Sequence, residues 1–216
     1  MKKIGIIHTT SATIAGLNSL VKEIIGEAEI INILDDSILG DMREKHNVDF
    51  VKERWISYAK VLEKLGVDAV LSACSTVGAF AEAADQILTI PVYRIDDAMC
   101  TRAVENGTVI SVFATLKSTL EPTVELIERK AALSGKQVKI NTVLVEGAYA
   151  ALMEGRKELH DEKIKVAVEQ YLPESDMVVL AQASMASAVN TDGLDGEKIL
   201  TSPRLGILKL AKDLER

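Results

Sequence analysis

Residues 68–79 of the chain read Asp-Ala-Val-Leu-Ser-Ala-Cys-Ser-Thr-Val-Gly-Ala, and residues 176–187 read Asp-Met-Val-Val-Leu-Ala-Gln-Ala-Ser-Met-Ala-Ser. Both stretches begin with Asp, continue as an apolar run and end in small residues, so that Cys74 is aligned with Gln182. Two further pairs follow in the same order: residues 4–9 match 110–115, and residues 29–35 match 140–146. Chance similarity between apolar strands is the alternative for any one pair. Three ordered pairs at spacings of 106, 111 and 108 residues predict a duplicated domain.

Short apolar runs alternate along the chain with longer segments of helical period. A continuous apolar run is typical of a strand buried on both faces of a parallel sheet, with helices as the connections. We therefore predict an α/β fold of two pseudo-symmetric open parallel-sheet halves, residues 1–98 together with 200–216, and residues 99–199. The predicted strands are residues 4–7, 30–34, 69–71, 92–95, 109–113, 140–145, 178–180 and 199–200, and the clearest predicted helices are 48–65, 120–133 and 161–171.

The composition is that of an ordinary globular protein and excludes several classes. With 48% hydrophobic and 26% charged residues, the chain has enough apolar side chains for a core and is neither disordered nor fibrous. The net charge of −7, with no basic stripe, argues against a nucleic-acid partner. No run approaches the ~20 apolar residues of a membrane span or resembles a signal peptide. We therefore expect a cytoplasmic protein without a membrane partner.

Cysteine and histidine spacing argues against structural metal and disulfide sites. Cys74 and Cys100 form no disulfide framework or zinc motif, and His8, His46 and His160 show no metal-ligand spacing. No phosphate-loop or G-x-G-x-x-G pattern supports nucleotide binding. The residues therefore give no support for a metal site or a bound nucleotide.

Small hydroxyl side chains follow several predicted strands. Ligands of open parallel sheets bind beyond the carboxyl ends of the strands, where hydroxyls and helix N-terminal amides suit a carboxylate or another small oxyanion. The alternative for each Ser or Thr is an ordinary helix N-cap. Together they predict an anion-binding cleft between the two halves. The candidate substrate-binding residues are Thr9, Thr10, Ser11, Ser75, Thr76, Thr115, Ser118, Thr119 and Ser184.

Cys74 is the leading catalytic candidate, because it stands where an apolar strand gives way to the start of a helix. The positive end of a helix dipole favours the reactive thiolate, although an inert buried thiol is the alternative. Cys100 has neighbours typical of core packing. His8 is either an acid or base near the cleft or a structural histidine at a strand end. Turn or N-cap roles explain the aspartates that follow strands equally well: Asp35, Asp36, Asp96 and Asp97.

Four motifs resemble the aspartate/glutamate/hydantoin racemase superfamily over essentially the whole chain. They are residues 4–10 (Ile-Gly-Ile-Ile-His-Thr-Thr), 73–78 (Ala-Cys-Ser-Thr-Val-Gly), 91–99 (Pro-Val-Tyr-Arg-Ile-Asp-Asp-Ala-Met) and 115–123 (Thr-Leu-Lys-Ser-Thr-Leu-Glu-Pro-Thr). The resemblance implies a cofactor-independent enzyme for a small carboxylate substrate, with two pseudo-symmetric domains and a homodimeric assembly. It also implies two cysteines, one from each half, that remove and return the substrate α-proton on opposite faces. The first of these corresponds to Cys74.

The second cysteine position is occupied by Gln182, which does not exchange a proton near neutral pH. Four interpretations remain open. A racemase or isomerase could take its second proton from His8 or a bound water, or a one-cysteine enzyme could decarboxylate its substrate or break a C–C bond. Cys74 could instead add to an unsaturated dicarboxylate, or the chain could bind a small carboxylate without chemistry. We expect the first, an amino-acid racemase-type isomerase with Cys74 as acid/base and Gln182 orienting the substrate.

Overall fold

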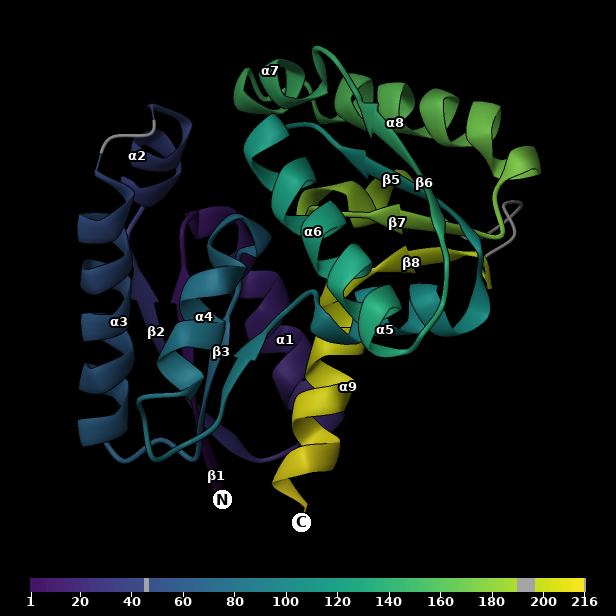
Figure 1. Cartoon of the computed structure of the whole chain (residues 1–216). Coiled ribbons are helices and arrows are strands. Elements are labelled where there is room, and N and C mark those ends of the chain that lie inside the picture. The colour runs from purple at the N-terminus through teal and green to yellow at the C-terminus, as the bar shows by residue number, and fades with distance from the viewer. Residues whose placement is uncertain (45–46, 190–196, 216) are drawn as a thin grey trace. The chain divides into compact units, whose positions relative to one another are not determined.

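The computed structural model describes residues 1–44, 47–189 and 197–215, so that His46 lies outside the described residues. The chain forms two compact units: unit 1 is Met1–Asp96 with Pro203–Arg216, and unit 2 is Asp97–Ser202. Each unit contains a four-stranded parallel sheet surrounded by helices (Figure 1), which confirms the predicted α/β class. Within the described ranges, no helix combines the length and the apolar character needed to cross a membrane.

The sheet of unit 1 has the strand order β2-β1-β3-β4, and each neighbouring pair is parallel. Helices α1 and α9 cover one face, and α3 and α4 cover the other (Figure 1). The strands are β1 (Lys2–His8), β2 (Ala28–Leu34), β3 (Ala69–Ser72) and β4 (Val92–Arg94). The helices are α1 (Ile14–Ile25), α2 (Ile38–Glu44), α3 (Val48–Lys64), α4 (Gly78–Asp85) and α9 (Ser202–Leu214), with short 3-10 turns η1 (Ser11–Thr13) and η2 (Ser75–Val77).

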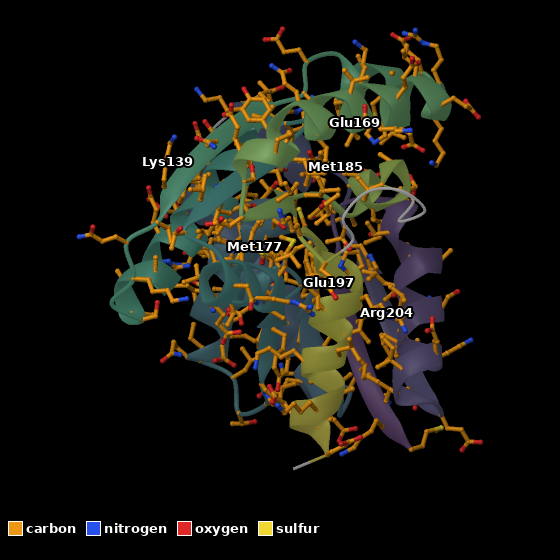
Figure 2. All side chains as sticks on the ribbon, turned by 90° about the vertical axis from the view of Figure 1, so that its right-hand side faces the viewer. Lys139, Glu169, Met177, Met185, Glu197 and Arg204 are labelled. Atoms are coloured by element: carbon orange, nitrogen blue, oxygen red, sulfur yellow. The ribbon has the colours of Figure 1, made fainter. Side chains whose placement is uncertain are left out.

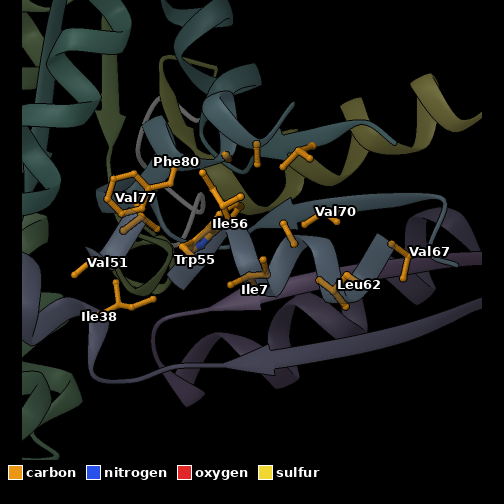
Figure 3. Packing of buried hydrophobic residues seen from close by; sticks show 14 residues of the cluster. Ile7, Ile38, Val51, Trp55, Ile56, Leu62, Val67, Val70, Val77 and Phe80 are labelled. Carbon is orange, nitrogen blue, oxygen red and sulfur yellow. The ribbon is translucent and has the colours of Figure 1, made fainter. Parts of the chain in front are cut away.

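Alternating side chains of β1 enter two separate cores of unit 1. Ile4 and Ile6 pack against α1 and α9, whereas Ile7 packs with α3 and α4 (Figure 3). Trp55 of α3 is fully buried in this second core. The predicted helix 48–65 is therefore confirmed, but its buried face is rotated relative to the sequence pattern. Val61 and Leu65 belong to that pattern and are 48% and 49% exposed, while Ile56 and Ala59 are buried.

The sheet of unit 2 has the equivalent order β6-β5-β7-β8, again entirely parallel. Helices α7 and α8 cover one face together with η4, whose Met185 is fully buried (Figure 2), and α5 and α6 contact β7 and β5. The strands are β5 (Val109–Ala114), β6 (Lys139–Leu144), β7 (Met177–Leu180) and β8 (Ile199–Thr201). The helices are α5 (Asp97–Asn106), α6 (Lys117–Leu133), α7 (Ala148–Met153), α8 (Lys157–Tyr171) and the 3-10 segments η3 (Leu172–Glu174) and η4 (Ala183–Ala188).

A hydrogen-bonding pattern at the start of the sheets is the same in both units. In unit 1, Lys3 donates its backbone N–H to the carboxylate of Asp68 at 2.7 Å, and Asp68 returns its own N–H to the Lys3 carbonyl at 2.7 Å. In unit 2, Val109 and Asp176 make the same pair of bonds, at 2.9 and 2.8 Å. Asp68 and Asp176, which open the aligned sequences, therefore make equivalent hydrogen bonds to the first strand of their units, as expected of a duplicated domain.

Two predictions from the sequence are wrong: the offset between β2 and β6, and the start of α6. Ile4 pairs with Ile30 in unit 1 and its equivalent, Ile110, pairs with Ile140 in unit 2, so these strands are offset by 110 residues and not by 111. A slip of one residue moves every side chain to the opposite face, and it went undetected because β2 and β6 are incompletely buried edge strands without a strict apolar pattern. The helix predicted from residue 120 begins at Lys117, directly after an extended Leu116.

Candidate active site

The carboxyl ends of β1 and β3 form the first part of the candidate site. The two strands are neighbours, and their pairing continues past β3, where Ala73 donates its N–H to the Ile7 carbonyl at 3.0 Å. This bond brings the residue before Cys74 next to the end of β1. Thr9, Ser75 and Thr76 at these ends are 3%, 5% and 5% exposed, so the hydroxyls are set in the protein rather than on its surface.

Cys74 has an extended backbone, with φ −134° and ψ 121°, and precedes the 3-10 turn Ser75–Val77. Its free thiol belongs to a partly exposed residue, and its carbonyl accepts a hydrogen bond from Ser72 Oγ at 3.4 Å. The α-helix itself begins only at Gly78, so that one 3-10 turn separates the thiol from it. Cys100, by contrast, is fully buried in α5, which confirms its expected place in the core.

The remaining hydroxyls of unit 1 are less suited to ligand binding. Thr10 is the N-cap of η1 and its Oγ1 accepts the N–H of Ala12 at 3.4 Å, so the capping alternative describes this residue. Ser11 is exposed in the first position of η1. Of the three hydroxyl residues expected after β1, only Thr9 is buried at the strand end.

His8 is fully buried at the end of β1, and both of its ring nitrogens have partners. Nδ1 lies 2.7 Å from Thr13 Oγ1, and Nε2 lies 2.9 Å from Asn32 Oδ1 on β2. Burial lowers the pKa of His8, and the hydrogen bond with Asn32 opposes this shift only in part. The ring is therefore neutral at physiological pH and ties the segment after β1 to the sheet. Within the described structure His8 has the setting of a support, not of a free acid or base.

Gln182 occupies the equivalent position in unit 2, with φ −121° and ψ 137°, directly before η4. Its Oε1 accepts the backbone N–H of Thr115 at 2.5 Å and the Thr115 hydroxyl at 2.9 Å. A backbone N–H can only donate, so these two bonds fix which way the amide points. Nε2, the donor end, has no hydrogen-bond partner among residues 1–44, 47–189 and 197–215. The side chain therefore presents two N–H donors and no acid.

The other predicted residues of unit 2 lie around this pair. Thr119 is buried in the first turn of α6, where its carbonyl accepts the Thr123 hydroxyl at 2.9 Å, so it is not the residue before the helix as the sequence predicted. Ser118 Oγ is buried without a hydrogen-bond partner among the described residues. Ser184 is half-buried in η4, and its carbonyl lies 3.4 Å from His160 Nε2.

Arg94, at the end of β4, and Glu82 of α4 were not singled out from the sequence. Asp96 lies in the turn between β4 and α5, as expected, and it is also the fully buried partner of Arg94, whose guanidinium reaches Glu82 as well. The available signal was an Arg at the end of a buried strand with an Asp two residues later. Asp97 pairs with Lys130 at 2.7 Å, and Asp36 is exposed.

Asp35, which follows β2, also belongs to a charged group. Burial alone would raise the pKa of Asp35, but hydrogen bonds from Ser37 and Tyr58 and the charge of Arg54 hold it below the ordinary value. Arg54 also donates to Asp41 at 2.7 Å and so connects α3 to α2. These contacts give Asp35 a structural role. No cluster of three or more His, Cys, Asp or Glu side chains suited to a metal occurs in the described part of the chain.

Residues 4–195 match the family model described as Asp/Glu/hydantoin racemase. The chain belongs to the Asp/Glu/hydantoin racemase family. The match spans both units and includes both strand ends described above, in agreement with the resemblance of the four sequence motifs. No match was found among curated proteins.

Solved structures of racemases share the fold of this family member at low sequence identity. Glutamate racemase from Bacillus anthracis is 17% identical with a TM-score of 0.75, over 99% of this chain and 82% of that one. Allantoin racemase from Klebsiella pneumoniae is 16% identical with a TM-score of 0.73, over 100% and 88%. An aspartate racemase homologue from Pyrococcus horikoshii is 18% identical with a TM-score of 0.71, over the whole of both chains. These likenesses establish the fold with its two subdomains.

Proposed function

We propose that the chain catalyses proton transfer at the carbon next to the carboxylate of a small substrate, as a cofactor-independent enzyme of the racemase type. Cys74 is the acid/base: its thiolate removes the α-proton from one face, a bound water protonates the opposite face, and the hydroxide that remains takes the proton from the Cys74 thiol. The observation that carries this proposal is the half-buried free thiol of Cys74 at the carboxyl end of β3, beside the buried hydroxyl residues Ser75 and Thr76. Family membership supports the same type of reaction.

The chemistry requires more than a base, because an α-proton beside a carboxylate is very weakly acidic. The enediolate that forms must be stabilised by donors aimed at its oxygens before the reaction begins. Gln182 meets this need in the proposal, since Thr115 holds its Oε1 and leaves the two N–H groups of Nε2 to donate. Buried hydroxyl residues complete the proposed carboxylate-binding set, namely Thr9, Ser75, Thr76 and Thr119, whereas Thr115 acts by holding Gln182.

Decarboxylation is the second candidate, and the fixed amide of Gln182 favours it. Racemisation needs a proton donor on each face of the α-carbon. An amide does not supply one, and both ring nitrogens of His8 have partners, so racemisation would have to use a bound water. Decarboxylation needs only one donor: a malonate-type substrate loses CO₂, the electron pair remains as the enediolate, and the Cys74 thiol protonates it. Water then restores the thiol. The same arrangement would carry either reaction or a C–C cleavage.

Proton NMR in D₂O tests the proposal on a panel of amino acids, hydantoins and substituted malonates. Exchange of the α-proton with inversion identifies a racemase, exchange with retention identifies one-base proton transfer, and loss of a carboxyl group identifies a decarboxylase. The control pair is Cys74→Ala and Cys100→Ala, because the second variant removes the other thiol of the chain from a core position.

The expected result is that one class of substrate reacts, that Cys74→Ala loses the reaction, and that Cys100→Ala retains it. Reaction at an unchanged rate in Cys74→Ala contradicts the proposal. Binding of small carboxylates without any reaction, by both the original chain and Cys74→Ala, would instead identify a carboxylate-binding protein.

A further inference from the structure

Arg94, Asp96 and Glu82 form a charged cluster next to the turn that carries Cys74, and the proposed function gives this cluster no role. The side chain of Arg94 is 5% exposed and that of Asp96 is fully buried. Arg94 donates from Nε to one oxygen of Asp96 and from Nη2 to the other, both at 2.9 Å, and from Nη1 to Glu82 at 2.8 Å. All three guanidinium nitrogens are therefore held in place.

The guanidinium remains charged in this setting. Burial alone would lower the pKa of Arg94, but the hydrogen bonds and charges of Asp96 and Glu82 raise it above the ordinary value. Desolvation makes buried ion pairs poor sources of folding stability, and apolar residues of similar volume often serve as well or better. The bidentate contact between the Arg94 guanidinium and the Asp96 carboxylate instead fixes the orientation of the guanidinium.

Gly78 lies directly against the guanidinium. A Cβ atom built on this residue would stand 2.3 Å from Arg94 Cζ and 2.4 Å from both Nε and Nη2. Such distances are far inside van der Waals contact, and the bonds to Asp96 and Glu82 keep the guanidinium from moving aside. Gly78 is the joint at which η2 ends and α4 begins, and its N–H donates to the Ser75 carbonyl. The guanidinium therefore abuts the far end of the turn Cys74–Gly78.

The duplicated unit lacks this device. Arg94 pairs with Ser72 on β3, and the equivalent residue of unit 2, paired with Leu180 on β7, is Thr201. With Cys74 aligned on Gln182, the position of Gly78 is occupied by Ala186. A cluster needed by the scaffold would be expected in both units. The cluster of Arg94, Asp96 and Glu82 occurs in the unit that has Cys74, and it is absent from the unit that has Gln182 at the equivalent position.

We propose that Arg94 is a positioning residue for Cys74, with Asp96 and Glu82 aiming its guanidinium against Gly78 so that the turn Cys74–Gly78 keeps one conformation. The proposal rests on the proposed function only through the role of Cys74. Asp96 and Glu82 hold the Arg94 guanidinium against the turn. The Cys74 thiol and the backbone amides that follow it are thereby fixed relative to β3 before substrate binds.

The test uses Arg94→Lys and Arg94→Met in a Cys100→Ala background, where Cys74 is the one remaining thiol. Arg204→Met is the matched control, because it removes an arginine of the same unit from a surface ion pair with Glu23. The first measurement is the rate of Cys74 alkylation by iodoacetamide as a function of pH. The second is kcat and KM on the substrate found in the NMR panel.

Both Arg94 variants should shift the pH profile of alkylation and lower kcat by ~10²-fold with a smaller change in KM, the size expected of a misplaced catalytic group. Arg204→Met should change neither. Gly78→Ala should reproduce the effect, and adding it to Arg94→Met should change nothing further. Asp96→Asn replaces Arg94→Met if the latter does not fold.

Unchanged alkylation and unchanged kcat in folded Arg94→Lys and Asp96→Asn overturn the positioning role. The two proposals fail separately. If no substrate reacts but the alkylation profile shifts, the positioning role stands and the proposed reaction falls. If the enzyme is active through Cys74 and the Arg94 variants behave as the original chain, the reverse holds.

Discussion

The ends of β3 and β7 have the same backbone and different chemistry. Cys74 and Gln182 share an extended conformation before a 3-10 turn, and the strands that precede them start with the same aspartate hydrogen bonds. One side chain is a thiol, a group that can act as an acid or base, and the other is an amide that accepts hydrogen bonds from Thr115 through Oε1 and has only N–H donors at Nε2. The two units have thus kept the position of this side chain and differ in its chemistry. A shared fold therefore does not imply that both halves take part in the reaction in the same way.

The difference extends to the residues that support each end. Unit 1 has His8 and Asn32 in contact on adjacent strands, and the equivalent residues of unit 2 are Ala114 and Thr142. In unit 2 the support is the direct bond between Thr115 and Gln182. In unit 1 the end of β1 is therefore tied to β2, whereas in unit 2 the residue after β5 is bonded directly to Gln182.

The largest effect should come from removing the thiol. Cys74→Ala is expected to lower kcat by ~10²–10⁴-fold, the usual contribution of a positioned acid or base. Steady-state kinetics on the substrate from the NMR panel measures it, with Cys100→Ala as the control. A loss of less than about tenfold would place the acid/base elsewhere.

Removing the amide donor should have the next largest effect. Gln182→Leu is expected to cost ~10²–10³-fold in kcat, the size seen when one donor to a developing oxyanion is lost. Gln182→Glu should be as slow, because it can keep the contact with Thr115 but offers no N–H. Equal activity of the Glu variant and the original chain would show that donation from Nε2 is not needed.

The Thr115 hydroxyl should matter less, since the backbone N–H still holds the amide in its absence. Thr115→Val removes one hydrogen bond to Gln182, worth about 1 kcal/mol, and should lower kcat by roughly fivefold to tenfold. Thr115→Ser retains the hydroxyl and should match the original chain. The comparison is made by kcat under saturating substrate, and a Val variant as fast as the Ser variant would rule out a contribution from this bond.

The smallest effect concerns stability and belongs to His8. Its folded-state pKa lies below the ordinary 6.5, so the unfolded chain binds the proton first as the pH falls. Stability is therefore lost on acidification below 6.5, by at most ~1.4 kcal/mol per pH unit from this one group. Urea unfolding at about pH 7 and about pH 5 should show a smaller fall for His8→Gln than for the original chain. An identical fall would contradict this role.

The sequence was sufficient to predict the structure of segments in which apolar residues follow a regular pattern. In the described part of the chain each predicted strand is found at its predicted place, and the alignment of Asp68 with Asp176 identified the duplication. It failed at β2 and β6, because a partly exposed edge strand lacks the alternation that defines register. It also misplaced the start of α6, since Thr119 resembles an N-cap although the helix begins two residues earlier without a side-chain cap.

The candidate site was predictable in its positions but not in its contacts. Cys74 and Gln182 could be aligned from sequence because both follow apolar strands. The bond from Thr115 to Gln182 joins residues 67 apart in the chain, and Arg94 meets Gly78 only after β4 and α4 have packed. Such contacts depend on tertiary packing, which periodicity does not encode. The sequence therefore placed Asp96 correctly in a turn but did not predict its ion pair with Arg94.

The path of the chain through the two units has a consequence for the order of folding. The chain leaves unit 1 after Asp96 and returns at Pro203, and Ile207 and Leu210 of α9 then pack against Ile4 and Ile6 of β1. During synthesis the whole of unit 2 therefore leaves the ribosome before α9, one of the two helices that cover this face of the sheet. Unit 2 is continuous and can finish folding first, since domains generally fold as units. The half that carries Cys74 is begun first and completed last.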